Sequence, residues 1–223
     1  YVVFCAAELS GRVMMYQTRF MAADFNQAIL HGVSIQKSKL PAADFSGASM
    51  AQIVATDSEF KCGSFVDVAA EGCAFSACDF NQTEWSGVKA HRCVFLNCQL
   101  QLCYFNQSTF ERCQLAGDSW LTASSFMHSQ FGNCGLRSSK GAGVVFINTF
   151  FRDSDMAMID YPCIRFESSG LVNCLANESN FSFGSFASSL LVNTSLMDSR
   201  FVEVELHETD FYQSDVLLTD FEG

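Results

Sequence analysis

The sequence predicts an all-β solenoid built from four-sided coils of about 20 residues. Three observations predict it: large apolar residues recur every five positions, small residues stand two positions before them, and aromatic residues recur every 20 positions. A five-residue period fits neither an α-helix nor a continuous strand, whose periods are about 3.6 and 2. It fits short extended segments joined by regular corners.

The five-residue step spans the chain with two interruptions. It runs from 20 to 120 and from 126 to 221, after a short run that ends at Met14. One six-residue step therefore follows Met14 and another follows Trp120, which predicts a single-residue bulge after each of them. The 44 central positions hold 21 of the 23 phenylalanines, which predicts that central side chains point inward. Two phenylalanines fall outside these positions, Phe150 and Phe183.

The slot two positions before each centre is small or β-branched nearly everywhere, and the departures are Arg12 and Asp118. One large and one small inward residue per side describe a narrow core. Asp118 is then an inward carboxylate, which is costly to bury without a partner. We expect the neighbouring bulge to let it reach a backbone amide or water; a local weak point with a functional role is the alternative.

Glycine also marks special positions. Gly141 leaves one centre empty, so we expect an indented or bent coil there, with a groove as one outcome. Glycine, asparagine or glutamine often stands two positions after a centre, and both prolines, Pro41 and Pro162, stand one position after. This is the preference of the two middle positions of a type II turn.

Every fourth centre forms a column, which tests the 20-residue coil independently. Ten of the eleven members of one column are aromatic: Phe4, Phe25, Phe45, Phe65, Trp85, Phe105, Phe126, Phe146, Phe166 and Phe186, followed by Leu206. The chain should therefore make about 11 stacked coils, a rod of roughly 50 Å at ~4.8 Å per coil.

Short motifs carry a resemblance to a known family. The segments Ala23-Asp24-Phe25, Ala43-Asp44-Phe45 and Cys78-Asp79-Phe80 resemble the Ala-Asp/Asn-Leu/Phe-X-X unit of the pentapeptide-repeat family, and the resemblance covers essentially the whole chain. It implies a right-handed, four-sided parallel β-helix. We expect residues 1–223 to form one such domain, a fragment of a longer chain.

Charge and hydropathy exclude several classes of partner. The formal net charge is −11, from 24 acidic and 13 basic residues, whereas direct binding to nucleic acid needs Lys and Arg to neutralise phosphates. No apolar run approaches the roughly 18–20 residues of a membrane span, and no signal peptide is visible. We expect neither nucleic acid nor a membrane as partner, and a bacterial cytoplasmic location or secretion as part of a larger protein.

Cysteine is abundant but is not arranged like a metal site or a disulfide framework. Eight of the eleven cysteines occupy inward slots, where a free thiol packs as a small apolar group. A straight column of thiols does not converge on a tetrahedral zinc ion, and an odd number of unpaired cysteines favours a reducing compartment. The slot cysteines are Cys73, Cys78, Cys93, Cys98, Cys103, Cys113, Cys134 and Cys174, and those at corners are Cys5, Cys62 and Cys163.

No arrangement of residues points to catalysis. All four histidines follow a centre by one or two positions and should face solvent, and His31 and His91 are about 14 Å apart, too far for one metal. No motif combines Ser, Cys or His into a triad. We predict no enzyme activity, no cofactor and no metal.

Negative charge is concentrated in the last third of the chain. Residues 149–223 carry 13 acidic and 3 basic residues. We predict that the acids of the last coil and a half bind a basic protein partner; a solvated terminus that discourages stacking of open rungs is the alternative. These residues are Glu203, Glu205, Glu208, Asp210, Asp215, Asp220 and Glu222.

The resemblance implies a non-enzymatic protein-interaction scaffold. Because bacterial pentapeptide-repeat regions are often attached to larger proteins, one implied setting is an adaptor or cargo-linked domain of type VI secretion. A second hypothesis is a DNA mimic that binds a type II topoisomerase (gyrase), as in the quinolone-resistance branch of the family. That branch differs from this sequence in its inserted loops, its C-terminal dimerisation segment and the spread of its charge. A third hypothesis is the targeting domain of a bacterial effector.

Overall fold

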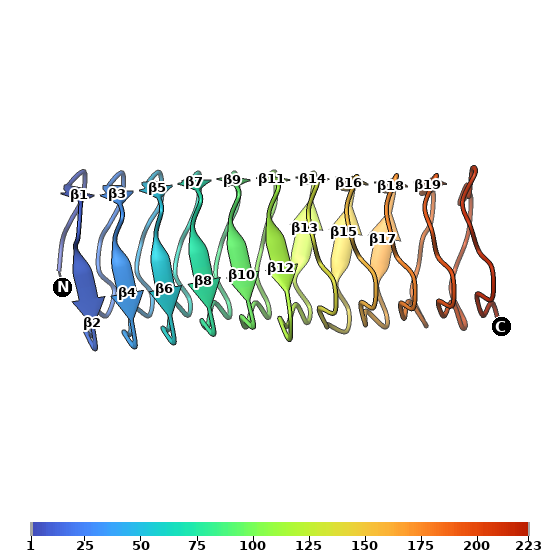
Figure 1. Ribbon diagram of the computed structural model, residues 1–223, viewed down its shortest axis with the longest axis horizontal. Coiled ribbons are helices and arrows are strands. Elements are labelled where there is room, and N and C mark those ends of the chain that lie inside the picture. Colours follow the sequence, from blue (N-terminus) through green and yellow to red (C-terminus); the bar gives the residue numbers. More distant parts are fainter. Residues whose placement is uncertain (1, 223) are drawn as a thin grey trace.

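Strands of three residues are the units of this computed structural model, which describes residues 2–222. In 18 of the 19 strands the middle side chain is buried and in β1 it is half-buried, whereas the flanking residues mostly face outward. Outward corners separate the strands, so each coil turns through four sides. Figure 1 shows the strands side by side along a straight rod, with the two ends of the chain at its opposite ends.

Parallel pairing at intervals of 20 or 21 residues stacks the strands into walls. The ten-stranded wall consists of β1 (Glu8–Ser10), β3 (Ile29–His31), β5 (Ser49–Ala51), β7 (Ala69–Glu71), β9 (Lys89–His91), β11 (Thr109–Glu111), β14 (Gln130–Gly132), β16 (Phe150–Arg152), β18 (Gly170–Val172) and β19 (Leu190–Val192). The six-stranded wall consists of β2 (Met14–Tyr16), β4 (Ser34–Gln36), β6 (Val54–Thr56), β8 (Ala74–Ser76), β10 (Val94–Leu96) and β12 (Gln114–Ala116). The three-stranded wall consists of β13 (Ser125–Met127), β15 (Val145–Ile147) and β17 (Arg165–Glu167).

The fourth side, the bridge-only wall, is held by isolated bridges such as Arg19↔Lys39 and Arg200↔Asp220. Residues 2–222 contain no helix, so the expected all-β, four-sided parallel β-helix is confirmed. The longest sheet has ten strands, one per coil, which makes the regular part of the rod slightly shorter than the expected 11 coils.

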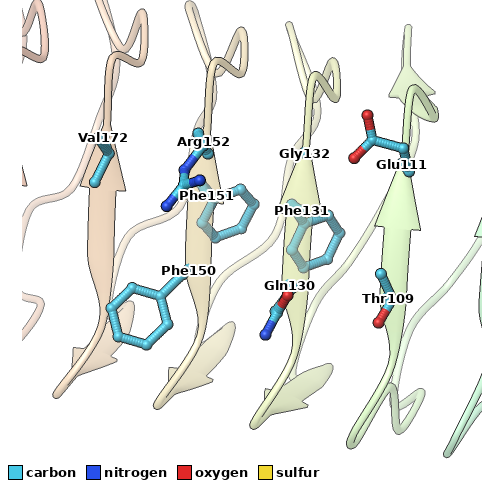
Figure 2. A pocket seen from close by; sticks show the side chains of 9 residues that line it. All are labelled: Thr109, Glu111, Gln130, Phe131, Gly132, Phe150, Phe151, Arg152 and Val172. Carbon is cyan, nitrogen blue, oxygen red and sulfur yellow. The ribbon is translucent and has the colours of Figure 1, made fainter.

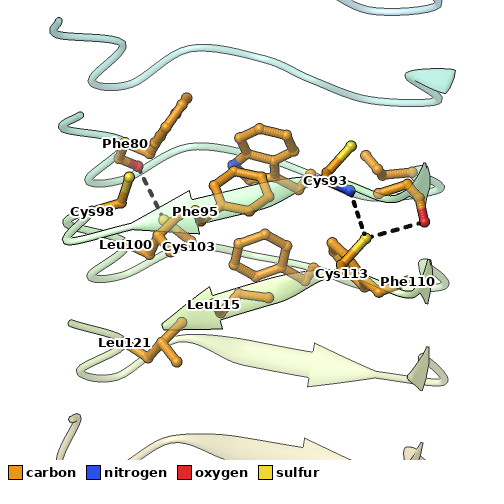
Figure 3. Close-up of a cluster of buried hydrophobic side chains, with 14 of the residues drawn as sticks. Phe80, Cys93, Phe95, Cys98, Leu100, Cys103, Phe110, Cys113, Leu115 and Leu121 are labelled. Carbon is orange, nitrogen blue, oxygen red and sulfur yellow. Dashed lines mark hydrogen bonds between the residues drawn. The ribbon is translucent and has the colours of Figure 1, made fainter. Parts of the chain in front are cut away.

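Stacked rings fill the interior, as the aromatic column predicts. Phe25 and Phe45 stack with ring centroids 4.7 Å apart and an interplanar angle of 3°, and Phe105 and Phe126 do so at 4.6 Å and 3°. Rings of neighbouring columns meet edge to face, a favourable geometry for aromatic pairs. The eight slot cysteines are also buried in this core, and Figure 3 shows several of them beside the rings.

The corners hold the backbone in the left-handed region. The residue two after each centre has a φ between 48° and 62° at the non-glycine positions, which is the positive φ that the turn residues predicted. Side chains there project away from the rod, so their chemistry is free to vary.

Both six-residue steps lie one corner earlier than the sequence pattern suggested. Met15 and Leu121 are the buried centres, whereas Met14 and Trp120 are 65% and 43% exposed. The extra residues therefore stand in the corners after Leu9 and after Leu115. The assignment of Met14 and Trp120 as centres was wrong, because two adjacent apolar residues made the local period ambiguous.

This shift also removes both departures from the slot rule. Val13 and Ser119 occupy the slots, and the polar side chains of Arg12 and Asp118 are exposed in the bulged corners. The assignment of Asp118 to an inward slot was therefore wrong, whereas the expectation that the bulge lets its carboxylate reach water is confirmed: Asp118 Oδ1 lies 3.0 Å from Lys140 Nζ at the surface.

Gly141 is buried, and the next coil fills the space beside it. The buried Tyr161 lies one coil further along the same column, and its hydroxyl donates a 2.6 Å hydrogen bond back to Ser139 Oγ in the Gly141 coil. A Cβ at 141 would lie 2.8 Å from the carbonyl carbon of Leu121. The coil is therefore closely packed at this point, and the groove suggested there is filled.

Candidate interaction surface

The seven acidic residues singled out from the sequence are all exposed, but they do not form one face. Four of them continue four different walls: Glu205 pairs with Ser185, Asp210 with Leu190, Asp215 with Ser195 and Asp220 with Arg200. With Glu203, Glu208 and Glu222 they surround the last coil, and we call this set the acidic collar.

Some collar carboxylates have local structural partners. Asp215 Oδ1 accepts a 3.0 Å hydrogen bond from the backbone N–H of Leu217, and Asp220 Oδ1 accepts one of 3.2 Å from Glu222. A hydrogen bond from the backbone N–H two residues later to an Asp carboxylate stabilises a turn. Part of the acidic composition is therefore explained by corner geometry.

The candidate metal ligands and thiols do not converge on a site. Within residues 2–222, no group of three His, Cys, Asp or Glu side chains is arranged to hold a metal ion. His91 Nδ1 lies 2.7 Å from Glu71 Oε2, and His31 Nε2 lies 3.2 Å from Gln52 Oε1. Burial raises the pKa of the Cys103 and Cys174 thiols to about 11, which keeps them protonated and unreactive at neutral pH.

A hollow of about 300 Å³ opens on the ten-stranded wall, between β11 and β18. Figure 2 shows that its outer rim is formed by Glu111, Thr109, Gln130, Phe150 and Arg152, with Gly132 between the two charged residues. The backbone of β14 and β16 forms the floor. None of these residues was singled out as a binding residue from the sequence.

Gly132 lines this hollow, and Gly170 lies beneath its rim residue Phe150. Gly132 stands in an outward position, where any other residue would project a side chain; its Cβ would meet the Glu111 carboxylate. Gly170 lies under Phe150, because a Cβ there would be 2.8 Å from Phe150 Cδ1. Phe150 thus leans over Gly170, and the Glu111 carboxylate lies over Gly132.

The charged rim is incompletely paired. Glu111 Oε1 accepts a 3.0 Å hydrogen bond from Asn133 Nδ2 and lies 3.8 Å from Arg112 Nε. Arg152 is exposed and makes no ion pair within 4 Å to any residue of the described chain. Its guanidinium is therefore available to a binding partner.

Apolar side chains continue the wall beyond the hollow. Phe150 is 49% exposed, Leu190 and Tyr212 are exposed, and Val172 and Val192 are half-buried on the same wall. Exposed apolar groups that cluster on one wall beside charged rim residues are typical of protein-binding surfaces. We call these five residues, together with Glu111, Gly132 and Arg152, the Phe150 surface.

One signal in the sequence marks this surface. Phe150 is one of the two phenylalanines outside the inward positions, and outward glycines stand 18 residues before it and 20 after it. An outward aromatic ring between two outward glycines is an exception to the repeat. Because the repeat itself explains the core so well, such an exception is informative about the surface.

Comparison with known proteins supports the fold. No protein-family model matches the sequence, and no curated protein matches it. The structure is similar to that of HetL, a pentapeptide repeat protein involved in heterocyst differentiation regulation from the cyanobacterium Nostoc, with a TM-score of 0.72 and 12% identity over 85% of this chain and 87% of HetL.

It is also similar to QnrB1, a plasmid-mediated fluoroquinolone resistance protein, with a TM-score of 0.60 and 15% identity over 77% of this chain and 90% of QnrB1. Among residues 2–222 there is no helix that is long and apolar enough to cross a membrane. The chain therefore has the fold of the pentapeptide-repeat proteins.

Proposed function

We propose that this solenoid is a non-enzymatic protein-interaction scaffold and that its docking site is the Phe150 surface. The observation that carries the proposal is an exposed aromatic ring beside an unpaired arginine and a glycine-floored hollow. Aromatic residues and arginine are the groups that contribute most to binding energy at protein interfaces. A straight, continuously hydrogen-bonded rod holds these groups at fixed spacing.

The family resemblance suggests the setting of this scaffold. An adaptor or cargo-linked domain of bacterial type VI secretion, or the targeting domain of an effector, would use such a wall to hold a second protein. The eleven free cysteines fit a reducing, cytoplasmic location. The acidic collar would steer a basic partner toward the rod without forming the specific contact.

Affinity capture with matched variants tests the scaffold. The wild-type chain, the Phe150→Ser/Leu190→Ser variant and a control, Leu102→Ser/Tyr104→Ser, are each immobilised and exposed to an extract of the organism that encodes the chain. Leu102 and Tyr104 are exposed apolar residues away from the Phe150 surface. A partner that is retained by wild type and control and lost by the Phe150/Leu190 variant, with purified components reproducing the difference, supports the proposal. A partner retained equally by all three contradicts it.

A gyrase-binding DNA mimic is the second candidate, favoured by the likeness to QnrB1 and by the net charge of −11. The concentration of net negative charge in residues 149–223 argues against it, because a mimic needs negative charge along the whole rod. The discriminating experiment is gyrase supercoiling with the domain at micromolar concentration, with and without a fluoroquinolone. Unchanged supercoiling and unchanged drug sensitivity would remove this candidate.

A further inference from the structure

We propose that the hollow of the Phe150 surface binds the carboxyl-terminal residue of a partner protein, a residue with an apolar side chain. This inference rests on the proposed function in one respect, that the ten-stranded wall binds protein, and it names the part of the partner that docks. Three groups around the hollow carry it: an unpaired base, an exposed aromatic ring and an acid that already has partners.

The size of the hollow limits what can enter it. Its volume of about 300 Å³ is at the lower end of the range for ligand pockets, which suits one residue of a chain. An α-helix is about 10–12 Å wide with its side chains, so it would lie across the wall instead of entering. A chain end therefore fits the hollow better than a packed element of a partner.

Arg152 supplies the receptor for a carboxylate. It makes no ion pair within 4 Å to any residue of the described chain, and its guanidinium presents a fork of N–H groups that matches both oxygens of one carboxylate. Gln130, in the neighbouring strand β14, lines the same hollow and offers an amide N–H (Figure 2). A carboxylate in the hollow would therefore meet donors from two strands.

Phe150 supplies the contact for an apolar side chain. Phe150 and Arg152 are the first and last residues of β16, so their Cα atoms lie about 6.6 Å apart on the same outer face. The ring is 49% exposed, and the half-buried Val172 lies in the next strand. A chain terminus carries a carboxylate and a side chain on one carbon atom and can reach both sites. An internal Asp or Glu uses its side chain for the carboxylate and has none left for the ring.

Glu111 favours a peptide over a free amino acid. Its Oε1 accepts a 3.0 Å hydrogen bond from Asn133 Nδ2 and lies 3.8 Å from Arg112 Nε, so its charge is partly compensated. One neutral N–H is then enough to complete its hydrogen bonds. The amide N–H of a terminal residue supplies this donor, whereas the ammonium of a free amino acid would be a second cation beside Arg112.

The spacing of these groups matches a single residue. The Glu111 carboxylate lies over Gly132 in β14, and Arg152 belongs to the neighbouring β16, about 4.8 Å further along the rod. Bond lengths place the nitrogen and the carboxylate oxygens of one residue about 3 Å apart, and each hydrogen bond adds about 2.9 Å. A terminal residue in the hollow can therefore bind the acid and the base together.

Selection from a library of short random peptides displayed with free carboxyl termini tests the proposal on the full chain. We expect the retained peptides to end in an apolar residue. The most enriched peptide, synthesised as the free acid and as its C-terminal amide, then serves as the probe. The amide should bind about tenfold or more weakly, because it lacks the charge that pairs with Arg152.

Variants of the base and the ring identify which group of the peptide each one binds. Arg152→Gln should weaken binding of the free acid by the same factor as amidation does and leave binding of the amide unchanged. Phe150→Ser should lessen the preference for an apolar terminal residue. The matched control is Arg200→Gln, an exposed base on the bridge-only wall, which should bind both probes as wild type does.

Two further variants test the acid and the shape of the hollow. Glu111→Gln keeps an oxygen that accepts the peptide N–H, so binding should stay within about threefold of wild type. Gly132→Leu adds a side chain that meets the movable end of Glu111, so the fold should survive while the hollow is filled and the free acid is no longer bound. Far-UV circular dichroism and thermal unfolding of every variant separate loss of binding from loss of fold.

Three results would overturn the proposal: no peptide retained by the folded wild-type chain, retained peptides whose amides bind equally well, or displacement of the probe by free leucine at equal concentration. The last result would assign the hollow to a free amino acid. A partner captured through the Phe150 surface that still binds after residues are added to its carboxyl terminus would overturn this inference and leave the scaffold function standing.

Discussion

Tyr161 reaches back toward the coil of Gly141, and its hydroxyl donates a 2.6 Å hydrogen bond to Ser139 Oγ. Ser139 Oγ in turn donates to the carbonyl oxygen of Leu136, so the buried hydroxyl groups of Tyr161 and Ser139 both have hydrogen-bond partners. A centre without a side chain is thus tolerated because the next coil supplies a large residue with a polar tip. Burial raises the pKa of the Tyr161 hydroxyl well above its ordinary value, which keeps it a donor.

Gly141→Ala should lower the free energy of unfolding by about 1–3 kcal/mol, as overpacking does. The added Cβ would lie 2.8 Å from Leu121 C and 2.9 Å from Thr122 N, which are backbone atoms that cannot move aside. The control is Gly135→Ala, where the only neighbour is Gln114 Cγ at 3.7 Å and no cost is expected. Urea unfolding of both variants measures the difference in the free energy of unfolding. Equal values would contradict the prediction, because they would show that a Cβ fits at position 141 without strain.

Phe105→Ala should cost about 3–5 kcal/mol, the usual cost of removing a core aromatic ring. Phe105 is buried and stacks between Trp85 at 5.8 Å and Phe126 at 4.6 Å. Phe150→Ala removes the same ring from the surface and should cost under about 1 kcal/mol. A loss below about 1 kcal/mol for Phe105→Ala would contradict the stacked core.

Periodicity alone predicts the core of this fold well, because each side of every coil places one large side chain in the interior, five residues after the last one. It fails by one residue at Met14–Met15 and Trp120–Leu121, where either apolar neighbour continues the count. The slot residue decides between them: Val13 and Ser119 fit the narrow interior, whereas Arg12 and Asp118 do not. The Phe150 surface could not be predicted from the repeat, because the tilt of Phe150 over Gly170 depends on contacts between coils.

Deletion of Asp118 tests the position of the second bulge. Without it, Leu115-Ala116-Gly117-Ser119-Trp120-Leu121 is a regular five-residue step, with serine in the slot and the positive-φ Gly117 at the corner. We expect a stability within about 1 kcal/mol of wild type, since the interactions lost are exposed ones: the ion pair to Lys140 and the hydrogen bond from the Asp118 backbone N–H to Asn97 Oδ1.

Deletion of Ser119 is the matched control. It also restores the five-residue step but places the Asp118 carboxylate in the buried slot, which should cost several kcal/mol, on the order of the penalty for burying an unpaired polar group. Equal thermal stabilities of the two deletions would show that the bulge does not lie in this corner.

Alkaline pH should destabilise the protein through its buried thiols. The pKa of Cys103 and of Cys174 is raised to about 11 in the folded state by burial, so between about pH 9 and 11 the folded chain binds more protons than the unfolded chain. The free energy of unfolding must therefore fall as the pH rises through this window, by at most roughly 3 kcal/mol per thiol. Urea unfolding at several pH values from 8 to 11, compared with the Cys103→Ala/Cys174→Ala variant, isolates this contribution from that of lysine and tyrosine. The variant should show the shallower decline; parallel pH profiles would mean that these two thiols ionise as easily in the folded chain as in water.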